Sequence, residues 1–163
     1  AKAYDQFMTL TKTNLRNGEL FYEAAQCKQQ LKAPFDEILT LLDSAVTAQD
    51  ARLSAPYVLA RGTALHGAKQ YRKAIVDYNR YDSLLQGRAS HDFYYTRALC
   101  EVELRQFQQA LNDYAHAIVL NRTEPTYYAE MAQLQLRVNQ KEDAVLTADL
   151  GLRVAPNSCL DKR

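Results

Sequence analysis

Two stretches of matching pattern decide the fold of this chain: YVLARGTALHGAKQYRKAIVDYNRY (Tyr57–Tyr81) and FYYTRALCEVELRQFQQALNDYAHAI (Phe93–Ile118). Each opens on an aromatic residue, and a second aromatic follows fourteen residues later. Two further stretches align with them, so that copies 1 to 4 are Phe21–Val46, Tyr57–Asp82, Phe93–Ile118 and Tyr127–Leu152, at steps of 36, 36 and 34 residues. A fixed period of this size predicts a solenoid, in which each unit buries its apolar face against its neighbours.

The residues inside the copies predict helices. In copy 2 the apolar positions recur at helical spacing and predict a buried face: Tyr71, Ala74, Ile75, Tyr78 and Tyr81. The polar residues between them are expected on the solvent face: Arg72, Lys73, Asp77 and Arg80. Small residues, such as Gly62 and Ala74, are expected where two helices cross. No stretch alternates apolar and polar residues long enough to predict a strand, so the chain is predicted to be all-α.

Proline and hydroxyl residues mark the expected helix ends. Ser54 and Thr123 each stand two residues before a proline and are predicted to be N-caps. Pro34 is expected to separate the two helices of copy 1.

This pattern resembles the tetratricopeptide repeat (TPR), a 34-residue helix–turn–helix unit, over roughly Glu19 to Ser158. The family's small residue in the first helix is matched by Gly62, Ala98 and Ala132, its first-helix aromatic by Tyr22, Tyr94 and Tyr128, its small residue in the second helix by Ala74, Ala110 and Ala144, and its closing proline by Pro156. Four positions depart from it: Gln26, Ile38, Val58 and Lys141. The resemblance implies a right-handed α-α superhelix of antiparallel helix pairs, with about nine helices.

The expected organisation is one continuous array. Residues 1–18 are predicted to hold a helix of a preceding repeat, with second-helix spacing over Lys2–Leu15. The four repeats are predicted at 19–52, 53–88, 89–124 and 125–158, with a tail at 159–163. The last helix would lack the polar cover that usually ends such arrays, at Val145, Ala148, Leu152 and Val154. We therefore expect a fragment of a longer repeat protein, or a partner or second molecule over this end; a natural chain with an unshielded end is the alternative.

Composition narrows the classes of function. The chain has 163 residues, of which 47% are hydrophobic, and its 20 basic and 19 acidic residues leave a net charge of +1. This balance gives no electrostatic footprint for nucleic acid, and no apolar run approaches the ~20 residues of a membrane span. We expect neither nucleic-acid binding nor membrane insertion. Both the cytoplasm and a bacterial periplasm are compatible with this sequence.

No motif of catalysis or metal binding emerges. Cys27, Cys100 and Cys159 form neither a disulfide framework nor a metal motif, and Cys100 is expected in the core. The three histidines share no metal-ligand spacing. Glu101 and Glu103 are expected on different faces or in solvent, as surface charge. The eleven tyrosines are interpreted as packing residues rather than base-stacking ones. A non-enzymatic chain without a cofactor is predicted.

The resemblance further implies a concave groove along the first helices, in which family members hold a peptide. The groove positions map onto Glu23, Cys27, Gln30, Leu59, Thr63, His66, Tyr95, Thr96, Leu99, Glu103, Glu130, Gln133 and Arg137. Tyr95 is the candidate hot spot, and packing against the next helix is its alternative. The clamp with which one subfamily grips acidic chaperone tails would need basic or amide residues at Glu23, Cys27, Ala60, Asp92 and Thr96, or at Leu59, Thr63, Thr96, Thr126 and Glu130, and every position fails.

The sequence therefore predicts a scaffold that binds a peptide or partner segment in the groove, and not of the chaperone-clamp type. Two alternatives stay open. One is self-association through uncapped terminal helices, and the other is a non-catalytic arm of a larger multidomain protein.

Overall fold

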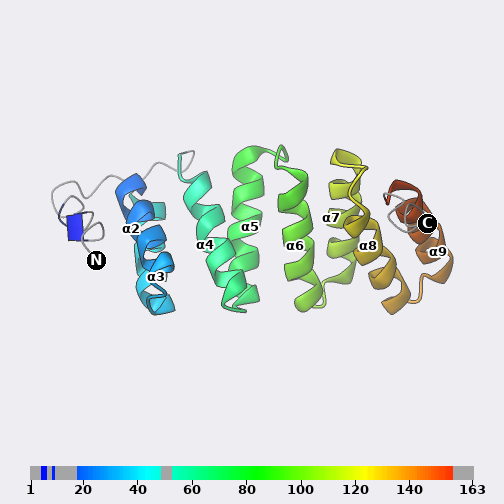
Figure 1. The fold of residues 1–163 in the computed structure, drawn as a ribbon, viewed down its shortest axis with the longest axis horizontal. Helices are drawn as coiled ribbons and strands as arrows, with labels where there is room; N and C mark the ends of the chain where they lie inside the picture. The colour runs from blue at the N-terminus through cyan, green and yellow to red at the C-terminus, as the bar shows by residue number, and fades with distance from the viewer. Residues whose placement is uncertain (1–4, 7–8, 10–17, 49–52, 156–163) are drawn as a thin grey trace, which may run out of the picture. The chain divides into compact units, whose positions relative to one another are not determined.

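The computed structural model of the chain describes residues 5–6, 9, 18–48 and 53–155, and the regular structure in these ranges is helical. Apart from residues 5, 6 and 9, which are helical, the described ranges contain eight helices in sequence (Figure 1): α2 Gly18–Gln30, α3 Phe35–Thr47, α4 Ala55–Gly67, α5 Tyr71–Leu85, α6 His91–Glu103, α7 Phe107–Leu120, α8 Pro125–Arg137 and α9 Lys141–Val154. The predicted all-α class is confirmed. The helix expected over Lys2–Leu15 lies largely outside the described residues, as do Pro156 and Cys159.

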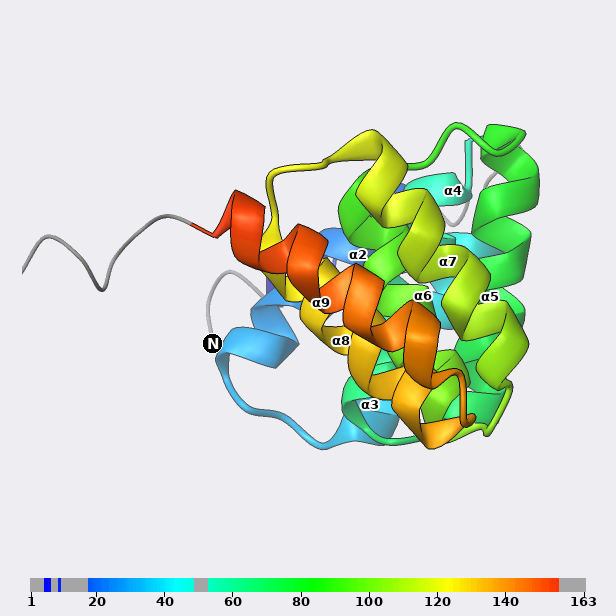
Figure 2. The same cartoon turned by 90° about the vertical axis from the view of Figure 1, so that its right-hand side faces the viewer.

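The helices form two compact units, and each is described by itself. Unit 1 is Ala1–Arg88, with α2 to α5, and unit 2 is Ala89–Arg163, with α6 to α9. In both units consecutive helices pack as pairs, and the second helix of one pair also contacts the first helix of the next, α3 with α4 and α7 with α8. Figures 1 and 2 both show α8 and α9 side by side and running in opposite directions. Within the described part of the chain, every helix is too short or too polar to cross a lipid bilayer.

The turns inside copies 2 to 4 share one backbone conformation. Lys69, Arg105 and Asn139 have φ angles of 59°, 59° and 65°. The amide of the residue that follows each of them donates a 2.8 Å hydrogen bond to a carbonyl near the end of the first helix, as Gln106 does to Glu101. Helices commonly end with one left-handed residue of this kind, usually glycine. Because Lys69 and Arg105 are not residues that usually adopt this conformation, the sequence did not indicate these turns.

The predicted helix starts are confirmed in part. Pro34 separates α2 from α3, and Ser54 is the N-cap of α4, although its hydroxyl makes no cap hydrogen bond. The prediction for Thr123 is wrong. The N-cap of α8 is Glu124, whose carboxylate accepts from the amide of Thr126 at 3.1 Å. The hydroxyl of Thr123, two residues before α8 begins, instead donates to Asn121 Oδ1 at 2.8 Å.

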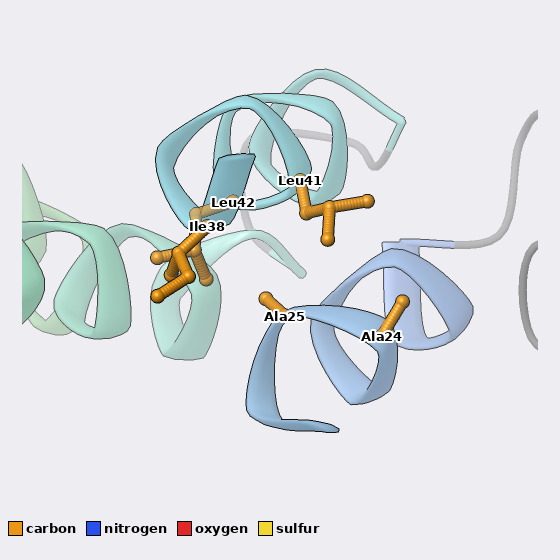
Figure 3. Close-up of a cluster of buried hydrophobic side chains, with 5 residues drawn as sticks. All are labelled: Ala24, Ala25, Ile38, Leu41 and Leu42. Atoms are coloured by element: carbon orange, nitrogen blue, oxygen red, sulfur yellow. The ribbon is translucent and has the colours of Figure 1, made fainter. Parts of the chain in front are cut away.

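The core of unit 1 is a cluster between α2 and α3. Ala24 and Ala25 point from α2 towards α3, which supplies Ile38, Leu41 and Leu42 (Figure 3). Small residues on α2 let the two backbones approach, and the larger α3 side chains fill the space between them. In unit 2 the corresponding cluster joins three helices through Ala98, Ala110, Leu111, Tyr114 and Leu134.

Two glycines sit where helices pack most closely. A Cβ at Gly62 would lie 3.1 Å from both Asp77 Cβ and the ring of Tyr78. Gly62 therefore lies at a close helix crossing, as predicted, and its nearest neighbours there are Asp77 and Tyr78. A Cβ at Gly151 would lie 2.8 Å from that of Tyr128, so a larger residue would push α9 away from α8.

Buried ion pairs join the two helices of copies 2 and 3. Arg61 binds Asp77 through two hydrogen bonds of 2.8 and 2.7 Å, and Arg97 binds Asp113 through two of 2.6 and 2.9 Å. Asp77 was predicted on the solvent face and is buried. The prediction failed because the sequence pattern of α5 does not show that Arg61, on α4, forms an ion pair with Asp77 and so allows its burial.

The expectation that Glu101 and Glu103 lie on different helix faces is confirmed, but Glu101 is not a surface charge. It is only 6% exposed, whereas Glu103 is exposed to solvent. Burial, and then the charge of Asp113, raise the pKa of Glu101 to about 7, although Arg97 acts in the opposite direction. Its Oε2 has no hydrogen-bond partner among the described residues, because the guanidinium of Arg97 is already engaged by Asp113.

The thiol of Cys100 is fully buried, as predicted for a small core residue. Burial, with the neighbouring glutamates, raises its pKa to about 11, so it is a thiol and not a nucleophilic thiolate at neutral pH. Cys27 is half-buried.

Candidate functional site

Unit 1 contains a hollow between α2 and α4, the first helices of copies 1 and 2. Its volume is about 400 Å³, within the range of about 300–1,000 Å³ for small-ligand sites. It is lined by residues of α2 and α4 and by one residue of α3: Tyr22, Ala25, Gln26, Gln29, Leu42, Pro56, Leu59, Ala60, Thr63 and Ala64. We call this feature the α2–α4 hollow.

One cause of the hollow is the side chain at a single repeat position of the second helix. Copy 1 has Leu42 there, whereas copies 2 and 3 have Tyr78 and Tyr114. All three side chains are fully buried. The ring of Tyr114 packs in one cluster with Ala98 of α6 and residues of α8. A leucine cannot reach as far, so the equivalent space in copy 1 stays open.

Small side chains on α4, the first helix of copy 2, also contribute to the hollow. Where α8 carries Glu130 and Leu134, α4 carries Ala60 and Ala64 at the same repeat positions. Leu134 is buried in the core of unit 2, and Ala60 and Ala64 pack against the core of unit 1. These three exchanges remove side-chain volume beside the hollow, whereas Gln26 of α2, at the repeat position of Ala98, adds some.

The hollow has an apolar floor and a polar edge. Ala25 and Leu42, both about 1% exposed, form the floor. Gln26, Gln29 and Thr63 lie at the edge, and Gln29 and Thr63 are exposed. The structure gives the two glutamine amides no hydrogen-bond partner within the described residues. Each amide can donate and accept, so the edge is able to bind a polar group beside an apolar one.

The charged residues near the hollow include acidic side chains close to Tyr57. Among the described residues that line the hollow, none is charged. Tyr57 lies beside it, with its ring centroid 5.4 Å from that of Tyr22. Burial raises the pKa of Tyr57, and the charges of Glu19 and Glu23 raise it further. The lining therefore offers no cation that could bind an anionic group.

In unit 2 the corresponding surface is closed by tyrosines. The ring of Tyr95 lies 4.9 Å from that of Tyr127 and 6.0 Å from that of Tyr114. The hydroxyl of Tyr127 donates to Asp92 at 3.0 Å and lies 2.8 Å from His91 Nδ1. Burial and this bond to Asp92 raise the pKa of Tyr127 to about 12. These contacts hold α6 against α8.

The residues predicted to line the groove in unit 1 divide into two groups. Leu59 and Thr63 line the hollow. His66 instead points towards α5, where its Nδ1 lies 3.1 Å from the hydroxyl of Tyr78. The three predicted residues of α2 do not line it: Glu23, Cys27 and Gln30.

In unit 2 the predicted residues are spread over α6 and α8. Tyr95 packs on Tyr127, and Leu99 packs against the core. The hydroxyl of Thr96 donates to the carbonyl of its own helix at Asp92, 2.8 Å away. The guanidinium of Arg137 lies 5.1 Å from the ring centre of Phe107. The remaining three are half-buried or exposed: Glu103, Glu130 and Gln133. Their role in binding a partner stays a prediction.

The sequence missed most of the hollow. Gln26 was noted only as a departure from the repeat pattern, and Tyr22 only as a match to it. The available signal was the pair of positions that face each other inside a copy: Gly62 with Tyr78, Ala98 with Tyr114, but Gln26 with Leu42. A copy without the tyrosine of this pair has space beside its first helix, and close packing requires that another side chain or a ligand fills it.

Helix pairs at a fixed period, each packed on the next inside its unit, define the tetratricopeptide-repeat fold, and the predicted resemblance is confirmed at this level. Solved structures of that fold are similar to this chain. MamA aligns at a TM-score of 0.80 with 17% identity, over 93% of this chain and 86% of its own. YrrB, described as a TPR protein with an unusual peptide-binding site, aligns at 0.76 with 15% identity, over 92% and 75%. The TPR domain of Arabidopsis OM64 aligns at 0.57 with 22% identity, over 68% and 89%. No protein-family profile and no curated protein sequence matches the chain.

Proposed function

We propose that this chain is a non-catalytic interaction scaffold that binds a segment of another protein in the α2–α4 hollow. The observation that carries the proposal is the hollow itself, with an apolar floor at Ala25 and Leu42 and free amides at Gln26 and Gln29. Apolar sites with a few polar groups at the edge are typical of ligand and peptide binding. The description of YrrB as a protein with a peptide-binding site supports this use of the fold.

The charges around the hollow favour a neutral or basic segment. Glu19 and Glu23 lie close enough to raise the pKa of Tyr57, and none of the described lining residues supplies a cation. An acidic tail would meet repulsion here. The proposal therefore keeps the expectation that the chain is not a carboxylate clamp.

The test is a selection of random peptides displayed on phage against the purified chain. Thr63→Arg, at the exposed edge of the hollow, is expected to weaken the selected peptides at least tenfold, because the long cationic side chain covers the opening. Isothermal titration calorimetry with the synthetic peptides measures the change.

Gln133→Arg is the matched control, because Gln133 occupies the same repeat position in unit 2 and is also exposed. Peptides that lose affinity only with Gln133→Arg would place the site in unit 2. The proposal fails if no peptide is selected, or if neither substitution changes its affinity.

A second candidate is self-association through α9. Val145 and Leu152 are 60% and 73% exposed, although Leu111, at the repeat position of Val145 in copy 3, is buried beneath α8. The apolar face of α9 thus offers the surface that α7 uses to hold the next helix. We propose that a second molecule of this chain covers it.

Analytical ultracentrifugation over a range of concentrations tests this candidate. The wild-type chain is expected to associate as concentration rises, and Val145→Lys/Leu152→Lys to remain monomeric. The matched control is Val76→Lys, which changes a valine of α5 that is 64% exposed and lies outside the proposed interface. A wild-type chain that stays monomeric throughout would rule the candidate out.

A further inference from the structure

The α2–α4 hollow lies where unit 2 has a tyrosine ring of its own. Tyr114 extends from α7 into a cluster with Ala98 of α6 and Leu134 of α8. Its side chain is about 1% exposed, and because Leu134 belongs to the same cluster, it packs with a side chain of α8. Leu42 starts from the same repeat position with a shorter side chain and forms part of the floor of the hollow.

Within copy 2 the same position shows how closely a tyrosine is packed. The ring of Tyr78 would come within 3.1 Å of a Cβ at Gly62, and its hydroxyl lies 3.1 Å from His66 Nδ1. The ring is thus held between two helices, with its polar tip satisfied by a side chain of the first helix. In copy 1 the apolar floor is present, and the polar partners would be the amides of Gln26 and Gln29.

Resting on the function proposed above, we propose that the hollow binds one tyrosine side chain of the partner segment, which takes the place that Tyr114 holds in unit 2. An aromatic ring suits the volume opened by Leu42, Ala60 and Ala64. The glutamine amides favour tyrosine over the apolar alternatives, since the hydroxyl of tyrosine can form a hydrogen bond with them and phenylalanine or leucine cannot.

The uncharged lining of the hollow does not suit phosphotyrosine, the phosphorylated form of the proposed ligand. A phosphotyrosine would bring about two negative charges, and no lining residue among those described is a cation that could bind them. The proposed ligand is therefore an unmodified tyrosine.

The experiment uses p-cresol, the side-chain analogue of tyrosine, with toluene as the analogue of phenylalanine. Both are titrated into ¹⁵N-labelled full-length chain, and binding is followed by the NMR shifts of the Gln26 and Gln29 side-chain amides. We expect p-cresol to shift these signals and to saturate them. Toluene is expected to bind roughly 3- to 10-fold more weakly, the effect of one neutral hydrogen bond.

Two variants locate the binding. Gln26→Ala/Leu42→Tyr installs the pair that copy 3 has at Ala98 and Tyr114, and fills the hollow from inside. It is expected to abolish the p-cresol shifts, whereas Val76→Tyr, at an exposed position of the same unit, leaves them unchanged. If the double variant does not fold, as judged by circular dichroism, Thr63→Tyr at the exposed edge serves instead.

The outcomes separate this inference from the function on which it rests. Toluene binding as tightly as p-cresol, or p-cresol shifts that persist in the folded double variant, would overturn the tyrosine assignment. So would selected peptides that depend on Thr63 but contain no tyrosine; the proposed function would then stand without it. If p-cresol binds but no peptide is selected, the hollow is a site for a phenol side chain, and the proposed scaffold function is wrong.

Discussion

Replacing Arg97 by methionine is expected to lower the free energy of unfolding by about 3–5 kcal/mol, the range for removing one partner of a buried ion pair. Arg97 and Asp113 are joined by two hydrogen bonds of 2.6 and 2.9 Å, and their side chains are 12% and 7% exposed. Without the guanidinium, the carboxylates of Asp113 and Glu101 would remain buried without the cation that now offsets them. Urea denaturation measures the loss.

The chain itself supplies the compensating change. Copy 4 has Met131 and Thr147 at the repeat positions of Arg97 and Asp113. The double substitution Arg97→Met/Asp113→Thr is therefore expected to recover most of the stability lost in the single one. Arg80→Met, which changes an exposed arginine of α5, is the control and should cost little. A cost below about 1 kcal/mol for Arg97→Met, typical of a surface pair, would contradict the buried-pair interpretation.

Stability is also expected to fall by roughly 3 kcal/mol as the pH rises from 4.5 to 7, through Glu101 alone. The folded state raises the pKa of Glu101 from 4.5 to about 7, chiefly by burial and then by Asp113. Between these values the folded chain keeps a proton that the unfolded chain has lost, so each step up in pH favours unfolding. Below pH 4.5 both states are protonated, and above pH 7 the loss is complete.

Glu101→Gln tests this pH dependence, because Gln135 shows that glutamine is accepted at this repeat position in copy 4. The difference in the free energy of unfolding between variant and wild type should shift in favour of the variant by roughly 3 kcal/mol across that range. Comparing the two proteins cancels the other titrating groups. Parallel stability curves for the two would show that Glu101 keeps its ordinary pKa in the folded state.

The helix pairs could be predicted from the sequence because they depend on periodicity. Apolar residues at helical spacing, repeated at a nearly constant step, leave few arrangements in which every copy buries its face. Tyr78 and Ala74 are buried as that pattern requires. The details at helix ends were harder, because Glu124 and Thr123 are both able to accept from free amides and only the local backbone chooses between them.

The candidate site was predicted less well than the fold. Leu59 and Thr63 line the hollow, but His66 is turned to Tyr78 within its own copy. A groove position tells which helix face a residue occupies, and not whether a neighbour fills the space in front of it. That depends on side chains from three helices, and the decisive one, Leu42, belongs to a second helix.

By itself, then, the sequence determined that this chain consists of repeated helix pairs, because the spacing of apolar residues is a local property of each copy. Only the tertiary structure decided which charges are buried and where space remains. Asp77 is buried because Arg61, sixteen residues away, reaches it from another helix. The hollow depends on Leu42, Ala60 and Ala64 together, and a missing volume becomes visible only when all the helices around it are in place.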